Sequence, residues 1–171
     1  MIYVSPLSAV EEAVKNLKPS HLISLLDEKT MIPTPEGIHS DRHLRLAIND
    51  IHVPVDDLVC PAHEHVEELI SFARSWDRSA PMLVHCWAGI SRSTSSAYVA
   101  LCALNEPGTE MAFARLLRQR GPHANPNPRI IALGDELLGR NGRMIEAISS
   151  IGPASSVWEG NLYALPVTIA P

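Results

Sequence analysis

Residues 84–93 read VHCWAGISRS, and this stretch decides the expected fold. The apolar run just before it, residues 80–84, is typical of a short buried strand, and the residues from Ser93 to Leu104 are typical of a helix. A strand, a tight loop and a helix N-terminus in that order form an anion-binding site, because the loop N–H groups point inward and the helix dipole favours negative charge. The sequence therefore predicts an anion site between a strand and a helix.

Two side chains of this loop suit the chemistry of phosphoryl transfer. Arg92 carries a planar guanidinium that can hold two phosphate oxygens at once. Cys86 would lie at the base of the same site, where positive surroundings favour the ionised thiolate. A thiolate beneath a bound phosphate is a nucleophile directed at phosphorus. The alternative interpretation is an inert buried cysteine, which is common in protein cores.

The full pattern, His85-Cys86-x5-Arg92-Ser93 with Gly89 inside, resembles the signature loop of the cysteine-dependent protein tyrosine and dual-specificity phosphatases. The resemblance covers about residues 20–138 and is strongest to small bacterial tyrosine-phosphatase-like proteins with a dual-specificity-type core. It implies hydrolysis of phosphomonoesters through a phosphocysteine intermediate, with phosphotyrosine, or phosphotyrosine, phosphoserine and phosphothreonine, in proteins as substrates. It also implies that the Ser93 hydroxyl stabilises the sulfur as it leaves phosphorus. No metal or cofactor is required by this chemistry.

The resemblance assigns phosphate binding to the loop backbone and the arginine. The expected substrate-binding residues are Trp87, Ala88, Gly89, Ile90, Ser91 and Arg92. The variable positions among them carry no lysine, which phosphoinositide-hydrolysing relatives often place there, and the Lys-Asn-Arg-Tyr motif of the tyrosine-specific branch is absent. Trp87 is bulky and would pack under the loop or line the rim of the pocket. A phosphorylated protein or a small phosphomonoester is therefore favoured over a phosphoinositide.

A phosphatase of this kind also needs a general acid for the leaving oxygen. Three aspartates precede the helix expected at residue 61, namely Asp50, Asp56 and Asp57. The segment HLRLAIND, residues 43–50, matches the strand of form Tyr-Leu-x-Ile-x-x-x-Asp that carries the acid in the dual-specificity family, which favours Asp50. Asp56 and Asp57 remain alternatives, because Asp57 also fits the family spacing and geometry decides such an assignment.

Two further residues are expected to support the signature loop. His85 stands at the strand end, where it would order the loop backbone or be a satisfied core histidine. The segment ANPN, residues 124–127, resembles the Ser-Pro-Asn stretch of dual-specificity phosphatases, whose asparagine side chain braces the signature loop. Asn127 is the matching position, and it suits a helix N-cap before Pro128 equally well.

Composition limits the fold and the partners. The chain has 171 residues, of which 46% are hydrophobic and 19% charged, which suits one globular domain with a sizeable core. Its net charge of −5 argues against nucleic-acid or anionic-membrane binding. The N-terminus lacks the pattern of a secretory signal, and no apolar run has membrane-spanning length. A catalytic thiolate requires a reducing compartment, so we expect a cytoplasmic protein.

The whole pattern predicts one α/β domain over residues 1–171, with a central, mostly parallel sheet of four to five strands flanked by helices, as in dual-specificity phosphatases. Strands are expected over residues 2–4, 21–26, 44–48 and 80–84. Ser8 and Glu11 have the spacing of a capping box, and Pro61 suits the first turn of a helix. Further helices are expected over 109–120, 127–138 and 142–149, followed by an apolar, irregular tail over 152–171.

Two other clusters are expected to have no catalytic role. His63, His65 and Glu67 suggest a metal site, but histidines two apart point to different helix faces and the ligand pattern of a zinc helix is absent. Cys60 and Cys102 would protect the nucleophile if they formed a disulfide with it on oxidation, but two ordinary buried cysteines are the simpler interpretation.

Two other functions use a similar loop. A rhodanese-like sulfurtransferase or an arsenate reductase also places a cysteine in an anion-binding loop, but the six-residue spacing from Cys86 to Arg92 and the upstream aspartates argue against both. A non-catalytic phosphoprotein-binding module would keep the loop without turnover. The intact Cys86 and Arg92 argue against that module.

Overall fold

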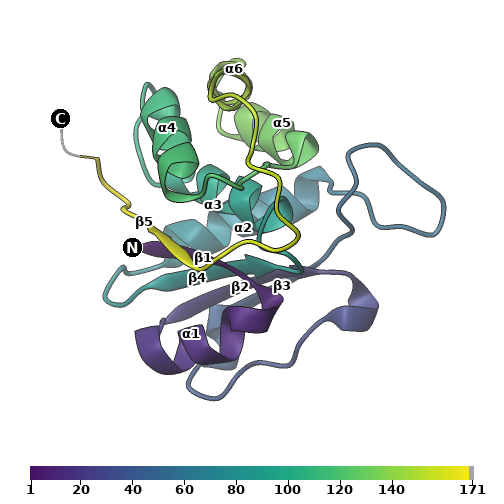
Figure 1. Ribbon diagram of the computed structural model, residues 1–171, viewed down its shortest axis with the longest axis vertical. Coiled ribbons are helices and arrows are strands. Elements are labelled where there is room, and N and C mark those ends of the chain that lie inside the picture. The colour runs from purple at the N-terminus through teal and green to yellow at the C-terminus, as the bar shows by residue number, and fades with distance from the viewer. Residues whose placement is uncertain (170–171) are drawn as a thin grey trace.

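The computed structural model describes residues 1–169, and within them five strands form one sheet in the order β3-β2-β4-β1-β5 (Figure 1). The strands are β1 (Ile2–Pro6), β2 (His21–Leu26), β3 (His43–Ala47), β4 (Met82–Cys86) and β5 (Tyr163–Leu165). The first four strands are parallel, and β5 pairs antiparallel with β1. The expected α/β fold with a mostly parallel sheet is confirmed.

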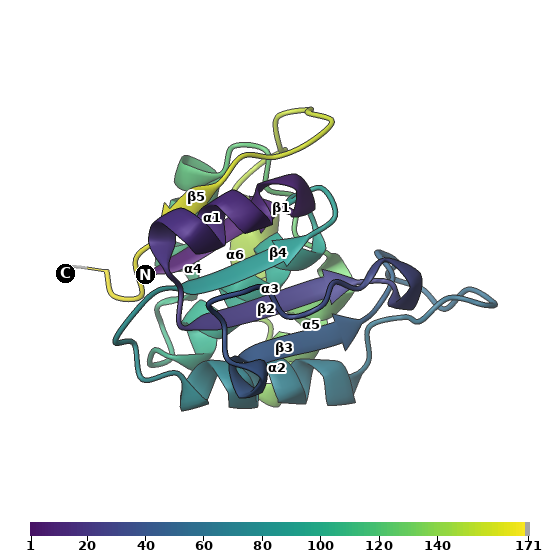
Figure 2. The same ribbon diagram turned by 90° about the horizontal axis from the view of Figure 1, so that it is seen from below.

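Helices cover both faces of this sheet (Figure 2). On one face lies α1 (Val10–Leu17), and on the other lie α2 (His63–Ser75), α3 (Arg92–Ala103), α4 (Glu110–Arg120), α5 (Pro128–Leu137) and α6 (Arg143–Ser150). Short 3-10 turns occur at Leu7–Ala9, Glu28–Thr30 and Ser40–Arg42. Within the described residues, no helix combines the length and the apolar character that crossing a bilayer requires.

The helices on both faces of the sheet explain why the central strands are mostly apolar. Every residue of β2, HLISLL, and of β4, MLVHC, is buried, as expected for parallel strands with helices on both faces. Because the four parallel strands end at the same edge of the sheet, the loops that follow them meet there. That edge is where the signature loop leaves β4 and enters α3.

Two predicted helix starts are wrong. The N-cap of α1 is Ala9, without a side-chain cap, because the Ser8 hydroxyl donates to the distant Glu159 carboxylate (2.8 Å) instead of forming a capping box. Pro61 lies before α2, whose N-cap is Ala62. A long-range hydrogen bond explains the first difference.

The prediction of a wholly irregular tail is also wrong. Residues Tyr163–Leu165 form β5, and Leu165 and Val167 are buried in the main core. The strand pairs with β1 over Ile2 to Val4, so it covers backbone groups that would otherwise form a sheet edge. The tail therefore belongs to the domain.

Candidate active site

The signature loop, residues 87–91, is held from outside by backbone groups of three distant segments. The N–H groups of Leu7, Asn125 and Gly160 donate to the carbonyls of Trp87 (3.0 Å), Ile90 (2.9 Å) and Ala88 (2.8 Å). In a planar trans peptide the N–H points away from its carbonyl. Because these carbonyls face the surrounding chain, their peptide N–H groups are turned toward the inside of the loop, where an anion would bind.

Gly89 allows this loop to lie close to the end of β1. Its φ is +69°, and a Cβ at this position would lie 2.6 Å from the backbone nitrogen of Pro6. Both the left-handed backbone and the missing side chain are therefore required. This is the physical reason for the glycine in the signature pattern.

Cys86 ends β4, and Arg92 begins α3, so the two side chains are brought to the same loop by different elements. The Cys86 sulfur lies 3.1 Å from the Ser93 hydroxyl. Nη1 of Arg92 donates to the carbonyl of Ile48 (2.8 Å), which fixes the guanidinium at the end of β3. Its Nε is buried without a hydrogen-bond partner among residues 1–169. A buried, unpaired donor beside a thiol is what a bound oxyanion would satisfy.

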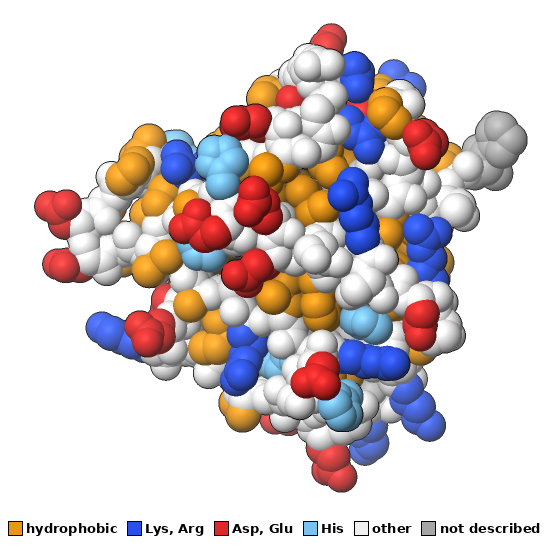
Figure 3. Space-filling view, turned by 180° about the vertical axis from the view of Figure 1, so that it is seen from behind, with side chains coloured by type: hydrophobic (Ala, Val, Ile, Leu, Met, Phe, Trp, Pro, Cys, Tyr) orange, Lys and Arg blue, Asp and Glu red, His pale blue; other side chains and the backbone are white. Residues whose placement is uncertain are grey.

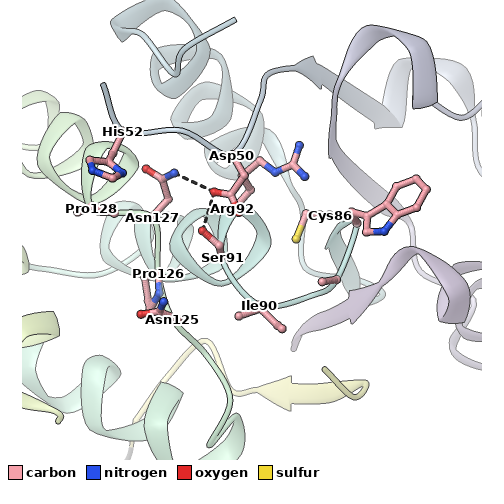
Figure 4. A pocket seen from close by; sticks show the side chains of 12 residues that line it. Asp50, His52, Cys86, Ile90, Ser91, Arg92, Asn125, Pro126, Asn127 and Pro128 are labelled. Atoms are coloured by element: carbon pink, nitrogen blue, oxygen red, sulfur yellow. Dashed lines mark hydrogen bonds between the residues drawn. The ribbon is translucent and has the colours of Figure 1, made fainter. Parts of the chain in front are cut away.

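Asp50 lies in the same cavity and is fixed by two neighbours (Figure 4). Its Oδ1 accepts hydrogen bonds from the Ser91 hydroxyl (2.7 Å) and from the Asn127 amide (3.0 Å). Because both hydrogen bonds go to Oδ1, Oδ2 is the oxygen available to carry a proton. The carboxylate is thus linked to the signature loop and to the N-terminus of α5.

Asp56 and Asp57 lie elsewhere on the same long loop. Asn49 closes the base of this loop, because its N–H donates to the Val59 carbonyl and its side chain accepts from the Val59 N–H, both at 2.8 Å. Beyond that point the loop projects from the domain with its side chains exposed (Figure 3). Asp57 occupies a left-handed position (φ 64°) in a turn, which aspartate tolerates. Neither residue lines the cavity that holds Cys86.

Asn127 occupies one of the two positions that the sequence left open, the N-cap of α5. Its Oδ1 accepts from the N–H groups of Arg129 (3.0 Å) and Ile130 (3.3 Å), so the N-cap interpretation is correct. Its Nδ2 donates to Asp50 and to the carbonyl of Ile51 (3.2 Å). Among the described residues, this side chain therefore holds the aspartate loop rather than bracing the signature loop.

The cavity has a volume of about 760 Å³ and brings most of the expected residues together. The predicted residues that line it are Asp50, Cys86, Trp87, Ala88, Ile90, Ser91, Arg92 and Asn127. Gly89, Ser93 and His85 support the loop without lining the cavity. Trp87 is exposed and lies at the rim.

Four further residues line the cavity that were not expected from the sequence, namely His52, Asn125, Pro126 and Pro128. A signal was present, because His52 follows Asp50 by two residues and the other three flank Asn127.

His85 belongs to a series of hydrogen-bonded polar side chains in the protein interior that the sequence did not reveal. Its Nε2 lies 2.6 Å from the Ser24 hydroxyl, which lies 2.8 Å from Nε2 of His43, and Nδ1 of His43 lies 2.9 Å from the Thr34 hydroxyl. His85 Nδ1 faces the carbonyl of Cys86 (3.4 Å), so this nitrogen carries the proton. Ser24 then donates to His85 and accepts from His43. In this arrangement both imidazoles are neutral, and His85 orders the backbone at the nucleophile.

Burial keeps both histidines neutral, and this makes stability depend on pH. Burial is the main cause that lowers the pKa of His85 to about 4, and it lowers the pKa of His43 to about 4 as well. In the unfolded chain both would titrate near 6.5. Between about pH 6.5 and pH 4 the unfolded state binds more protons, so the free energy of unfolding falls as the pH is lowered through this window.

We expect the protonation of His85 in the unfolded chain, while the folded protein keeps it neutral, to lower the free energy of unfolding by about 3 kcal/mol over that window. His43→Gln, which keeps a donor toward Ser24, is expected to remove part of this pH dependence. Urea unfolding at several pH values measures this pH dependence. The control is His39→Gln, a substitution of an exposed histidine. Equal pH dependence in the wild type and in His43→Gln would contradict the assignment of a neutral, buried His43.

His63, His65 and the two other cysteines lie outside the catalytic cavity. Nδ1 of His65 accepts from the N–H of Ala62 (3.1 Å), and His63 pairs with Glu136 (3.1 Å). Within residues 1–169 no three His, Cys, Asp or Glu side chains converge as metal ligands. Cys102 is buried in α3, and burial raises the pKa of its thiol to about 12. Cys60 is half-buried, so the expectation that it is a buried core cysteine is wrong.

The curated proteins that this chain resembles in sequence include phosphatases of viruses. Dual specificity protein phosphatase OPG106 of Monkeypox virus is 26% identical over 108 residues, which cover 62% of this chain and 57% of the viral protein. The matching protein of Vaccinia virus (strain Copenhagen) has the same identity and coverage. The chain thus spans less than two thirds of the length of these curated relatives.

Solved structures show the same fold. The crystal structure of DUSP15 has a TM-score of 0.63 at 22% identity and covers 88% of this chain and 92% of its own. That of human DUSP28 has a TM-score of 0.64 at 18% identity, with 85% and 94% covered. A family model described as "Polymorphic toxin system, DSP-PTPase phosphatase" matches residues 7–104, which include the aspartate loop, the signature loop and all of α3. The chain therefore belongs to the DSP-PTPase phosphatase family.

Proposed function

We propose that this protein is a cysteine-dependent phosphatase that hydrolyses phosphotyrosine, or phosphotyrosine together with phosphoserine and phosphothreonine, in proteins. The observation that carries the proposal is that Cys86, Arg92 and Asp50 line one cavity. A nucleophile, an anion clamp and a proton donor are the three groups that this reaction needs. Because the thiolate must stay reduced, we place the activity in a reducing compartment, the cytoplasm.

In the first step the Cys86 sulfur forms a bond to phosphorus while the bond from phosphorus to the leaving oxygen breaks. Asp50 transfers its proton from Oδ2 to that oxygen, so the alcohol or phenol leaves neutral. The loop N–H groups and the unpaired Nε of Arg92 donate to the equatorial phosphoryl oxygens. These fixed donors stabilise the charge that develops in the transition state.

In the second step a water oxygen attacks the phosphorus of the phosphocysteine. Asp50, now ionised, accepts the proton of that water, and the bond from phosphorus to sulfur breaks. The electron pair of this bond returns to Cys86 as a thiolate. The Ser93 hydroxyl, 3.1 Å away, donates to the departing sulfur.

The function is tested by turnover of an aryl phosphate and of phosphopeptides in the presence of a metal chelator, beside a sulfur-transfer assay with thiosulfate. We expect phosphate release and no sulfur transfer. Sulfur transfer alone would support the sulfurtransferase alternative. Tight phosphopeptide binding without any turnover would support a non-catalytic binding module.

Asp50→Asn is expected to slow substrates with poor leaving groups by about 10²- to 10³-fold, within the range of general acid catalysis. An aryl phosphate with an acidic phenol needs little protonation, so its loss is expected to be small. Steady-state kinetics over a series of phenols of increasing pKa measures this difference. The amide of asparagine cannot supply the proton, although it fills the same space.

Asp56→Asn and Asp57→Asn are the matched controls, because they remove a carboxylate from the same loop outside the cavity. Both are expected to leave the leaving-group dependence unchanged. If Asp57→Asn alone produced the dependence, the acid would lie further along the loop and the assignment of Asp50 would be wrong.

A further inference from the structure

The C-terminal segment, residues 151–162, passes over the signature loop although it lies outside the residues that match the family model. Arg118 donates to the carbonyl of Gly152 (3.1 Å), and the N–H of Ser155 donates to the carbonyl of Pro122 (2.8 Å). Gly160 is buried against His123, and a side chain at this position would clash with that ring. The Gly160 N–H bonded to Ala88 then fixes the segment at the signature loop.

This contact places a second tryptophan beside the catalytic cavity. A second cavity of about 240 Å³ is lined by Trp87, Ala88, Trp158 and Glu159. Trp158 is 97% exposed and Trp87 is 56% exposed. An indole that is almost fully exposed buries no apolar area and so does not stabilise the fold. A pair of exposed indoles at one cavity therefore indicates a binding surface.

Besides the two indoles and Ala88, this cavity is lined by a carboxylate whose orientation is fixed by a hydrogen bond. Oε1 of Glu159 accepts a hydrogen bond from the Ser8 hydroxyl (2.8 Å). Glu159 is exposed, and its Oε2 has no hydrogen-bond partner among the described residues 1–169. A carboxylate therefore lines the same cavity as the two tryptophans.

Two indoles and a carboxylate are complementary to a cation. Arginine and lysine side chains bind over tryptophan faces through cation–π attraction, and arginine also stacks its planar group on them. The carboxylate would pair with the charge, while the indoles cover the apolar stem of the same side chain. An uncharged aromatic group would leave Glu159 unused.

The second cavity adjoins the catalytic one, because Trp87 and Ala88 line both. We infer that the Trp87–Trp158–Glu159 cavity is a specificity subsite that binds an arginine or lysine side chain close to the phosphorylated residue of a peptide substrate. This inference rests on the proposed function, since the phosphate group would occupy the signature loop at the same time. The segment outside the family match would then select substrates for a catalytic site inside it.

Phosphotyrosine peptides that differ at one position test this subsite. A single arginine, glutamine or phenylalanine is placed in turn at each of the three positions on either side of phosphotyrosine, and the Kd for Cys86→Ser protein is measured by calorimetry. At one position we expect arginine to bind about tenfold more tightly than glutamine or phenylalanine, the ratio that one cation–π contact with a paired charge supplies. Trp158→Ala in the same protein is expected to abolish the ratio.

Glu159→Gln removes the negative charge and keeps the size of the side chain. The glutamine oxygen can still accept the hydrogen bond from the Ser8 hydroxyl. The substitution is expected to reduce the preference for arginine over phenylalanine. Val157→Ala is the matched control, since Val157 is exposed in the same segment but lines neither cavity, and it is expected to keep the full ratio.

Equal Kd values for arginine and glutamine at every position, or an unchanged ratio in Trp158→Ala, would overturn the subsite. A preference for phenylalanine over arginine would overturn its cationic specificity. Turnover of an aryl phosphate by the wild-type protein is measured separately. Its absence would refute the proposed function, whereas the Kd ratios decide the subsite without any turnover.

Discussion

Cys86→Ser is expected to lower the turnover of an aryl phosphate by about 10⁴- to 10⁶-fold, the range seen when a covalent nucleophile is removed. A serine hydroxyl is almost fully protonated at neutral pH and is a far weaker nucleophile than a thiolate. The anion site should survive this change, because it is built from loop N–H groups and Arg92. Orthophosphate binding, measured by calorimetry, is therefore expected to stay within a few-fold of the wild type.

Cys60→Ser is the control for this experiment, because Cys60 is half-buried and does not line the cavity. It is expected to keep full activity. Substantial turnover by Cys86→Ser would refute the phosphocysteine mechanism. Loss of phosphate binding together with turnover would show instead that the signature loop needs the sulfur for its conformation.

Arg92→Lys is expected to reduce kcat/KM by about 10²- to 10³-fold, nearly as much as Arg92→Ala, although the charge is kept. In the structure one nitrogen of Arg92 is engaged by the carbonyl of Ile48, while the buried Nε is left for the anion. A lysine ammonium is a single point of donation and cannot make both contacts in the same geometry. Steady-state kinetics with an aryl phosphate measures the loss.

Arg74→Lys on α2 serves as the control, because Arg74 is exposed and lies outside the cavity. Circular dichroism would establish that the Arg92 variants fold. A lysine variant with activity close to the wild type would mean that charge alone, and not the planar fork, stabilises the transition state.

Much of the fold follows from short-range patterns in the sequence. The short, mostly apolar run HLISLL, the helical spacing after residue 92 and the turn at Gly121 depend on neighbours in the chain, so β2, α3 and α4 lie within one or two residues of the prediction. The signature loop is local in the same sense. A glycine with φ +69°, a cysteine at a strand end and an arginine at a helix start fit within eight residues.

Which of the three aspartates is the general acid does not follow from short-range patterns. Asp50, Asp56 and Asp57 lie within one loop, and their spacing from Cys86 allows more than one of them to be the acid. The Ser91 hydroxyl and the Asn127 amide hold Asp50 at the cavity, whereas Asp56 and Asp57 lie on the projecting part of the loop and do not line it. The contacts that separate them join Asp50 to residues 41 and 77 positions further along the chain, and no local pattern contains such contacts.

The sequence by itself thus determined the α/β class, the order of the elements and the loop that carries Cys86 and Arg92, because each depends on residues close together in the chain. Only the tertiary structure decided that Ser24 and His43 support His85, that residues Tyr163–Leu165 form a strand beside β1, and that Trp158 lies next to Trp87. These contacts join residues between 19 and 163 positions apart. Such contacts form only when the sheet and its helices have brought the segments together, so they leave no periodic signal in the sequence.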